Sequence, residues 1–190
     1  MTDIKSQSLI YHLTCLANLP SILTQGLLPR SGLQGFTDVA DPSILLERQR
    51  FNLEDCVPFH FFCRNPFDGR VQKDHRDKKF ILLAVKRALA RERGWKIIPR
   101  HPLAGGNIQI MDYDAGLAAI NWQKMNERDY SDPESKSVCM AECIAPGVVP
   151  PTLFSNIFVR DENTRLNVSN MVVKAGFGIY VNANEKMFLK

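Results

Sequence analysis

The sequence lacks any apolar run long enough to cross a membrane, although 45% of its 190 residues are hydrophobic. A membrane-spanning helix needs about 20 consecutive apolar residues. The N-terminal stretch "MTDIKSQS" is polar and has none of the apolar core of a secretory signal peptide. The length and composition instead suit one compact domain, residues 1–190, with a substantial core and a cytoplasmic location.

Paired cysteines are also missing. The chain has five cysteines, an odd number, and no two of them form a C-x-x-C pair: Cys15, Cys56, Cys63, Cys139 and Cys143. This set argues against a disulfide framework and against a zinc knuckle. We therefore expect reduced thiols and no metal.

Several common catalytic signatures are absent as well. The adjacent glycines Gly105 and Gly106 have neither G-K-[ST] nor G-x-G-x-x-G around them, so a phosphate-cradling loop of either kind is excluded. The H-E-x-x-H signature of zinc hydrolases does not occur. No local signature supports a cysteine nucleophile.

Positive charge is abundant in only one part of the chain. The formal net charge is +4, yet residues 64–100 alone contain 12 Lys and Arg against four Asp and Glu, a balance of +8. Such asymmetry fits a face that contacts a polyanion such as nucleic acid. A solvated helix and loop would give the same pattern, so the charge alone does not decide between these readings.

Hydrophobic patterning predicts an α+β fold without internal repeats. Strands are predicted at 9–14, 80–85, 95–99, 138–145, 156–160 and 177–182. A further strand, interrupted near Pro58, is predicted to end at the Asn65-Pro66 pair. Helices are predicted at 18–26, 43–51, 86–94, 114–129 and 163–174. The polar stretches 68–79 and 130–137 are predicted to be loops.

One acidic residue has unusual neighbours. Glu142 lies in the apolar stretch "MAECIAPGVVPP", and no basic residue occurs within five positions on either side. A carboxylate in this setting either faces solvent from a strand or has a chemical task in a cleft. Four other polar residues occur in notable settings: His12 at a strand end, Asn18 at a helix start, and Arg48 with Arg50 on a short predicted helix or turn.

Three blocks of the chain together resemble the DarT family, which are DNA-modifying ADP-ribosyltransferase toxins. The blocks are "IYHLTCLANLPSILTQGLLP", "LEDCVPFHFFCRNPF" and "INWQKMNERDYSDPESKSVCMAECIAP", and they occur in the family's order. The resemblance implies an ADP-ribosyltransferase-like fold, a central split antiparallel sheet flanked by helices. It also implies transfer of ADP-ribose from NAD+, used as a substrate, to a base of single-stranded DNA. Thymidine and guanosine both remain open as the base.

The same resemblance implies roles for individual residues. Glu142 matches the catalytic glutamate. His12 matches the residue that binds NAD+ near the nicotinamide ribose, and Thr14 and Asn18 match further contacts around that pocket.

An arginine between the first helix and the Val-Pro-Phe block is expected to hold the phosphates of NAD+ and to assist catalysis. Arg48 and Arg50 both qualify, and the sequence does not choose between them. Lys136, His101 and Arg64 are the predicted contacts to nucleic acid.

The family also implies a partner, a macrodomain antitoxin of the DarG type that removes the modification from DNA. Three positions depart from the family pattern, since Cys56 and His60 stand where the family has tyrosine and Asn65 stands where it has serine. Two other functions remain open from the sequence. One is a transferase that modifies RNA or protein, and the other is a nucleic-acid-binding module without catalysis.

Overall fold

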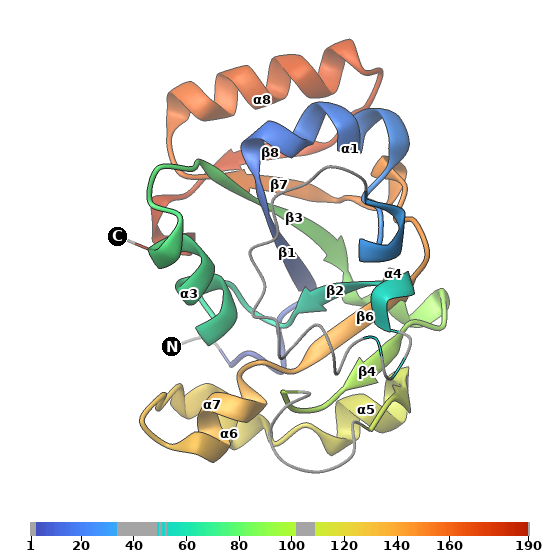
Figure 1. Ribbon diagram of the computed structural model, residues 1–190, viewed down its shortest axis with the longest axis vertical. Coiled ribbons are helices and arrows are strands. Elements are labelled where there is room, and N and C mark those ends of the chain that lie inside the picture. The colour runs from blue at the N-terminus through green and yellow to red at the C-terminus, as the bar shows by residue number, and fades with distance from the viewer. Residues whose placement is uncertain (1–2, 34–48, 50, 52, 102–108, 190) are drawn as a thin grey trace.

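The computed structural model describes residues 3–33, 49, 51, 53–101 and 109–189 (Figure 1). It contains eight strands: β1 Leu9–Cys15, β2 Cys56–His60, β3 Phe80–Lys86, β4 Lys96–Ile98, β5 Met111–Asp112, β6 Glu142–Pro146, β7 Asn156–Val159 and β8 Tyr180–Ala183. The helices in the same ranges are α1 Leu19–Gln25, α3 Pro66–Asp74, α4 Arg87–Glu92, α5 Tyr113–Ala119, α6 Trp122–Glu127, α7 Pro133–Val138 and α8 Glu162–Lys174. All eight strands join one sheet in the order β5-β4-β6-β2-β1-β3-β7-β8.

The sheet is nearly divided between β1 and β2. β1 pairs with β3 along its whole length, from Leu9 to Cys15, whereas it pairs with β2 only at Tyr11 and His60. One half of the sheet therefore holds β1, β3, β7 and β8, and the other holds β2, β6, β4 and β5 (Figure 1). The expected α+β fold with a split sheet is confirmed.

One strand pair departs from the antiparallel expectation. β7 and β8 run parallel, with Asn156 opposite Tyr180 and Val159 opposite Ala183. The cause is α8, which joins the two strands and packs against both of them. A crossover helix returns the chain to the same end of the sheet, so the next strand must run in the same direction.

The strand with Pro58 is continuous but shorter than expected. Pro58 lies opposite Ile144 of β6, and the strand ends at His60 instead of reaching the Asn65-Pro66 pair. The Pro58 carbonyl accepts a hydrogen bond from His12 of β1, so the backbone polar side of this residue faces β1. Since β1 diverges here, the missing N–H of proline removes no bond of the β2–β6 ladder.

Apolar side chains cover both faces of the sheet, because neighbours in a strand point in opposite directions. The main core lies on the face that includes Ile10, Phe59, Leu83 and Cys143, and α1 and α8 contribute to it. Two smaller clusters occupy the second face: Tyr11, Leu82, Ala84, Met187 and Phe188 form one, and Leu53, Ile98 and Ile144 form the other.

Two segments expected as loops are helices, α3 and α7. Each begins with a short polar side chain that accepts a backbone hydrogen bond, and a proline follows in the first turn. Asn65 accepts from the N–H of Asp68 at 2.9 Å, and Asp132 accepts from the N–H of Glu134 at 3.0 Å. Capping side chains and a first-turn proline stabilise helix starts even where the following residues are polar.

The region before Glu142 differs further from expectation. The single helix expected at 114–129 is two helices, because Asn121 caps a new helix by accepting from the N–H of Lys124. The strand expected at 138–145 begins only at Glu142, since α7 occupies the chain before it. The expectation of a short helix at 43–51 lies almost wholly outside the described residues.

No helix within the described ranges is long and apolar enough to span a bilayer.

Candidate active site

Glu142 lies in a row of paired residues that crosses four strands. Tyr11 of β1 is opposite His60 of β2, His60 is opposite Glu142 of β6, and Glu142 is opposite Ile98 of β4. Paired residues of antiparallel strands point to the same face, with Cβ atoms about 5 Å apart. Glu142 therefore stands beside His60 in the half-sheet that borders the split.

The Glu142 side chain is largely enclosed, with 8% of the residue exposed. Its strand is internal to the sheet, since β6 has β4 on one side and β2 on the other. Ile98, Ile144 and Leu53 form an apolar cluster on the same face. The reading of Glu142 as an edge residue facing solvent is therefore wrong. Apolar surroundings lower the local dielectric constant and strengthen the field of a carboxylate.

His60 is fixed next to Glu142 by a contact with the chain that leads into β6. Its Nδ1 lies 3.2 Å from the carbonyl oxygen of Ala141, and the residue is 5% exposed. A carbonyl only accepts, so Nδ1 carries the proton and donates. In the neutral ring Nε2 is then an acceptor.

His12 lies in the other half of the sheet and on the opposite face from Glu142, since its neighbour Tyr11 belongs to the Glu142 row and its partner Leu83 to the main core. Its Nδ1 donates to the Pro58 carbonyl at 2.8 Å and so bridges β1 and β2. The ring packs 5.7 Å from that of Phe59, which in turn lies 5.2 Å from Trp95. The Pro58 carbonyl can only accept, so Nδ1 of His12 carries the proton. In the neutral ring Nε2 is then an acceptor suited to a sugar hydroxyl.

Thr14 and Asn18 lie together, as expected for two contacts around one pocket. The Asn18 amide donates to the Thr14 hydroxyl at 3.1 Å, and Thr14 shares the strand face of His12. Asn18 occupies the cap position of α1, but its side chain makes no cap hydrogen bond. The Asn18 side chain therefore does not cap the helix, and its amide instead ties the start of α1 to β1.

Arg48 and Arg50 lie outside the described residues, so their predicted role stays a prediction. Sequence reasoning overlooked a third arginine in the same interval, Arg30. Its Nε is 4.0 Å from a carboxylate oxygen of Glu54, directly before β2. The sequence already indicated Arg30 as a candidate, because it is the first arginine after the first helix.

The three predicted nucleic-acid contacts all lie close to α7. Lys136 is exposed on that helix, and the His101 N–H donates to the carbonyl of Ser137 at 2.9 Å. The Arg64 carbonyl accepts from the Tyr130 hydroxyl at 3.2 Å, just before α7 begins. The structure thus places Lys136 on the helix that leads to Glu142, and it brings the main chain of His101 and of Arg64 close to that helix.

The basic segment 64–100 is only partly a surface feature. Arg87 is buried, and its guanidinium donates to the carbonyls of Lys5, Leu9 and Phe61 at 3.1, 3.1 and 2.9 Å. Burial lowers the pKa of this guanidinium from its ordinary value. Arg87 is a structural residue, which corrects the expectation that the whole segment faces a polyanion.

The sequence profile of the DarT family, described as ssDNA thymidine ADP-ribosyltransferase, matches residues 11–189. The chain belongs to the DarT family. This confirms the resemblance seen in the sequence, and it confirms the class of DNA-modifying ADP-ribosyltransferase at the level of the family.

Solved DarT structures share the fold. Thermus sp. 2.9 DarT in complex with ADP-ribosylated ssDNA superposes with a TM-score of 0.81 at 20% identity, over 96% of each chain. Thermus sp. 2.9 DarT in complex with NAD+ gives 0.78 at 17% identity, over 97% of this chain and 98% of that one. The arrangement of the eight strands is therefore that of the DarT fold.

A curated relative has a second part. The DNA ADP-ribosyl transferase-DNA ADP-ribosyl glycohydrolase fusion protein of Thermosipho africanus (strain H17ap60334) is 27% identical over 183 residues, covering 86% of this chain and 45% of the fusion protein. The chain thus spans about half the length of this relative.

Proposed function

We propose that this chain transfers ADP-ribose from NAD+ to thymidine in single-stranded DNA and acts as the toxin of a toxin–antitoxin pair. Membership of the DarT family supports the reaction and the base. The observation that carries the proposal is Glu142, a buried carboxylate beside His60 at the split of the sheet. The enzyme forms one domain over residues 1–190 and works in the cytoplasm, where its five cysteines stay reduced.

The reaction exchanges one bond at C1′ of the ribose for another. The bond between C1′ and the nicotinamide nitrogen breaks, and nicotinamide leaves as a neutral molecule with the electron pair. The ribose then has oxocarbenium character, as in glycoside hydrolysis. The negative charge of Glu142 stabilises this positive charge, and the apolar surroundings strengthen the effect.

The attacking atom is a ring nitrogen of thymine that carries a proton. N1 is bonded to deoxyribose, so N3 forms the new bond to C1′ and its proton passes to Glu142. General-base work of this kind contributes about 10²- to 10⁴-fold to a rate. The base must be unpaired to reach C1′, which favours single-stranded DNA over a duplex.

The other site residues bind the two substrates. Nε2 of His12 accepts from a ribose hydroxyl, and Thr14 with Asn18 lines the same pocket. An arginine grips the pyrophosphate with paired hydrogen bonds, and Arg48 and Arg50 are the proposed residues, with Arg30 as a third choice.

On the DNA side, Lys136, His101 and Arg64 hold the strand near α7. A macrodomain antitoxin removes ADP-ribose from the modified base, and the glycohydrolase half of the fusion relative supports such a partner.

The test is a mass measurement on DNA. The purified chain is incubated with NAD+ and single-stranded oligonucleotides that each offer one kind of base, and the products are weighed. We expect ADP-ribose on the thymidine oligonucleotide alone. Glu142→Gln keeps the size of the side chain, and we expect it to lower the rate about 10²- to 10⁴-fold.

Other outcomes select the alternatives. Modification of guanosine alone would change the assigned base. Modification of RNA or protein but not of DNA would assign a different substrate to the same site. If no substrate is modified and NAD+ does not change the melting temperature, the remaining alternative is a nucleic-acid-binding module without catalysis.

A further inference from the structure

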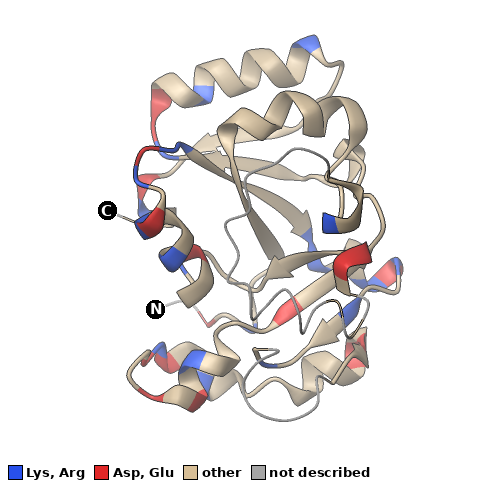
Figure 2. Ribbon diagram, in the orientation of Figure 1, with Lys and Arg blue, Asp and Glu red and all other residues tan. Residues whose placement is uncertain are grey.

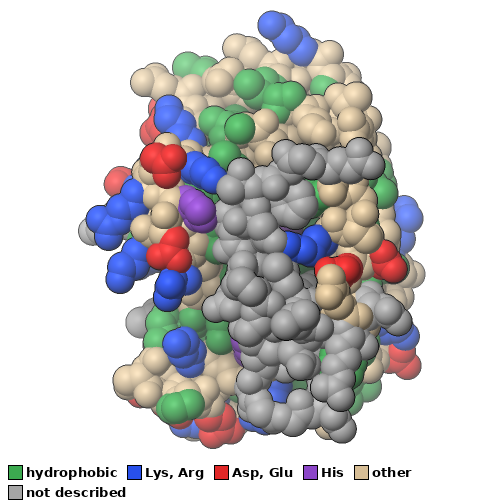
Figure 3. Space-filling model, in the orientation of Figure 1, with side chains coloured by type: hydrophobic (Ala, Val, Ile, Leu, Met, Phe, Trp, Pro, Cys, Tyr) green, Lys and Arg blue, Asp and Glu red, His purple; other side chains and the backbone are tan. Residues whose placement is uncertain are grey.

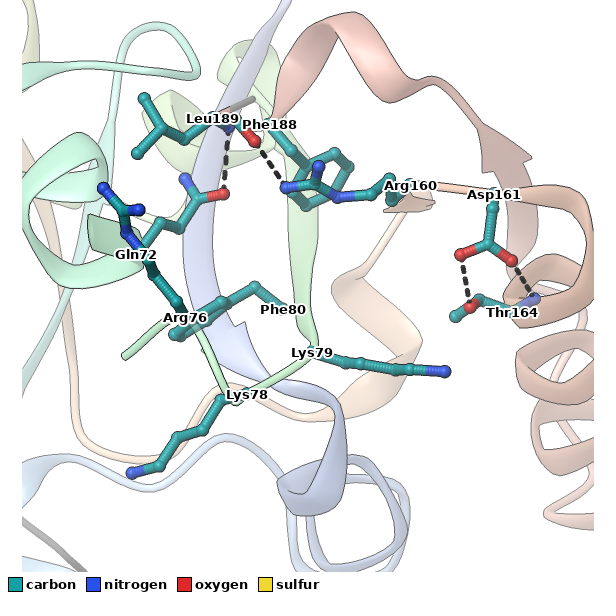
Figure 4. Close-up of a pocket in the computed structure, with 10 residues that line it drawn as sticks. All are labelled: Gln72, Arg76, Lys78, Lys79, Phe80, Arg160, Asp161, Thr164, Phe188 and Leu189. Atoms are coloured by element: carbon teal, nitrogen blue, oxygen red, sulfur yellow. Dashed lines mark hydrogen bonds between the residues drawn. The ribbon is translucent and has the colours of Figure 1, made fainter. Parts of the chain in front are cut away.

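A second basic region lies away from Glu142, around a cavity of about 450 Å³ (Figure 4). The turn between α3 and β3 forms one wall with Arg76, Lys78 and Lys79. The junction between β7 and α8 forms the opposite wall and contributes Arg160 and Asp161. Four cations and one acidic residue therefore border the same hollow.

The one acidic residue is already engaged. The Asp161 carboxylate accepts from the N–H and from the hydroxyl of Thr164, both at 2.8 Å, and so caps α8. These hydrogen bonds hold its pKa below the ordinary value, and it stays ionised as a cap. Lys79 is close enough to lower the pKa of Asp161 slightly further.

Some of the described cations form ion pairs, and the cations of this cavity do not. Elsewhere Arg70, Arg91, Lys96, Lys124 and Arg165 each pair with a carboxylate. Within the described ranges none of Arg76, Lys78, Lys79 and Arg160 forms an ion pair. Four cations against the single carboxylate of Asp161 leave the hollow with a positive balance, and an anion that binds among the cations lowers their mutual repulsion.

The geometry favours a polymer over a single compact anion. Figure 4 shows the Lys78 and Lys79 side chains extending from the turn in opposite directions, while Arg160 lies over Phe188 and donates to the Leu189 carbonyl. These positive charges are therefore spread along the hollow. A spread of cations matches the repeated phosphates of a nucleic-acid backbone.

The cavity opens on the face of the sheet that carries Glu142. Phe80 lines the cavity and packs in one cluster with Tyr11 and Phe188. Tyr11 belongs to the row that includes Glu142. The cavity and Glu142 are separated by three strand spacings across the sheet and by four residues along β3. Together these correspond to a distance on the order of 20 Å.

Basic residues also lie between the two places. Arg64, whose carbonyl is bonded to Tyr130 next to α7, donates from Nη1 to the carbonyl of Lys186 at 3.4 Å. Lys186 is exposed and precedes Phe188 at the cavity by two residues. Figure 2 marks Lys and Arg positions along the ribbon on the side of the molecule where α3 and both chain ends lie, and Figure 3 shows Lys and Arg side chains on that side.

We propose that Arg76, Lys78, Lys79 and Arg160 form a second DNA-contacting surface, which binds backbone phosphates of the strand that flanks the target base. The proposal rests on the proposed function for the identity of the polyanion. The surface increases affinity for strands long enough to reach it, and it leaves the chemistry at Glu142 unchanged.

The test compares two lengths of single-stranded DNA with one thymidine each, about 4 and about 16 nucleotides. Binding is measured without NAD+ over a series of salt concentrations. The variant combines Arg76→Gln, Lys78→Gln and Lys79→Gln. We expect about tenfold weaker binding of the long strand at low salt, and a salt slope smaller by about 2, since each phosphate contact on a single strand contributes about 0.7.

A matched control removes the same charge elsewhere. Lys86→Gln, Arg93→Gln and Lys174→Gln change three exposed cations that also lack ion pairs within the described ranges. We expect this control to keep the affinity and the salt slope of the wild type. With NAD+ present, the cavity variant should show a raised KM for the long strand, an unchanged kcat, and no change on the short strand.

Two results would overturn the proposal. One is a cavity variant that binds the long strand as the wild type does, and the other is a control that loses as much affinity as the cavity variant. Because binding is measured without turnover, an absence of ADP-ribosylation would remove the proposed reaction and leave this comparison intact. Melting temperatures of both variants verify that they are folded.

Discussion

Glu142 of β6 and His60 of β2 are paired residues on adjacent strands. His60 stands where the resemblance to the family places a tyrosine. A tyrosine hydroxyl both donates and accepts, whereas neutral His60 with its proton on Nδ1 has only an acceptor to offer at Nε2. The substitution therefore changes the direction of hydrogen bonding available next to the carboxylate. It preserves an aromatic side chain at the same place in the sheet.

Asp68 gives a prediction about stability and pH. The carboxyl is fully buried, Oδ2 accepts from the Asn65 amide at 2.8 Å, and Oδ1 has no partner among the described residues. Burial raises the pKa of Asp68 to about 8, against 3.8 as its ordinary value. The native state thus keeps a proton that the unfolded chain releases, so this contribution is complete below about pH 4 and is lost as the pH rises towards 8.

The variant Asp68→Asn tests this linkage, because it keeps the shape and the acceptor for Asn65 but has no proton to lose. We expect the wild type to lose free energy of unfolding between pH 5 and pH 9, on the order of 3 kcal/mol more than the variant does. Urea unfolding at a series of pH values measures both. Equal pH dependence in the two proteins would show that Asp68 is ionised in the native state.

At the scale of elements, the sequence predicted the buried strands and the long helix, but it did not predict the short polar helices. β3 is a continuous apolar run, and α8 buries Thr164, Val168 and Val172 at every fourth position; the sequence predicted both elements. α3 and α7 are short and polar, and what makes them helices is a capping side chain, a proline and burial of Asp68 and Ser135 against the rest of the protein. The last of these depends on tertiary structure and has no local signal.

The candidate site shows the same limit. Its residue types were visible in the sequence, but their neighbours depend on strand register. His60 pairs with Glu142, which is 82 positions away in the sequence. Arg30 contacts Glu54, and no motif marks either residue. Periodicity indicates which face a residue occupies and not which residue of another strand lies beside it.

Arg87 holds several elements together, and its loss is expected to be costly. Its guanidinium joins the N-terminal segment at Lys5, β1 at Leu9, and the chain after β2 at Phe61. Arg87→Met should lower the free energy of unfolding by about 3 kcal/mol, because one buried and two partly buried carbonyls lose a charged donor. Chemical denaturation measures the loss. Arg93→Met, at an exposed position after α4, is the control and should change stability little.

At the scale of the whole molecule, NAD+ should stabilise the fold. The proposed NAD+ contacts come from β1, α1 and the chain before β2, and they border both halves of the sheet. A ligand that binds only the native state adds about 2.7 kcal/mol at a concentration 100 times its Kd. We therefore expect NAD+ to raise the melting temperature, and we expect His12→Ala to reduce the shift.

A thermal melt with increasing NAD+ measures this effect, and Lys174→Gln serves as a control far from the split. An unchanged melting temperature at saturating NAD+ would contradict the placement of the cofactor. A full shift in His12→Ala would instead remove His12 from the set of NAD+ contacts.

The narrow join between β1 and β2 has a consequence for solubility. Where two strands of one sheet diverge, each presents an edge inside the molecule, and edges invite added strands and aggregation. Pro58 has no N–H to offer at the middle of that edge, and its carbonyl already accepts from His12. The proline therefore does inside the sheet what prolines do on outer edge strands, since it removes a donor to which another polypeptide strand could bond.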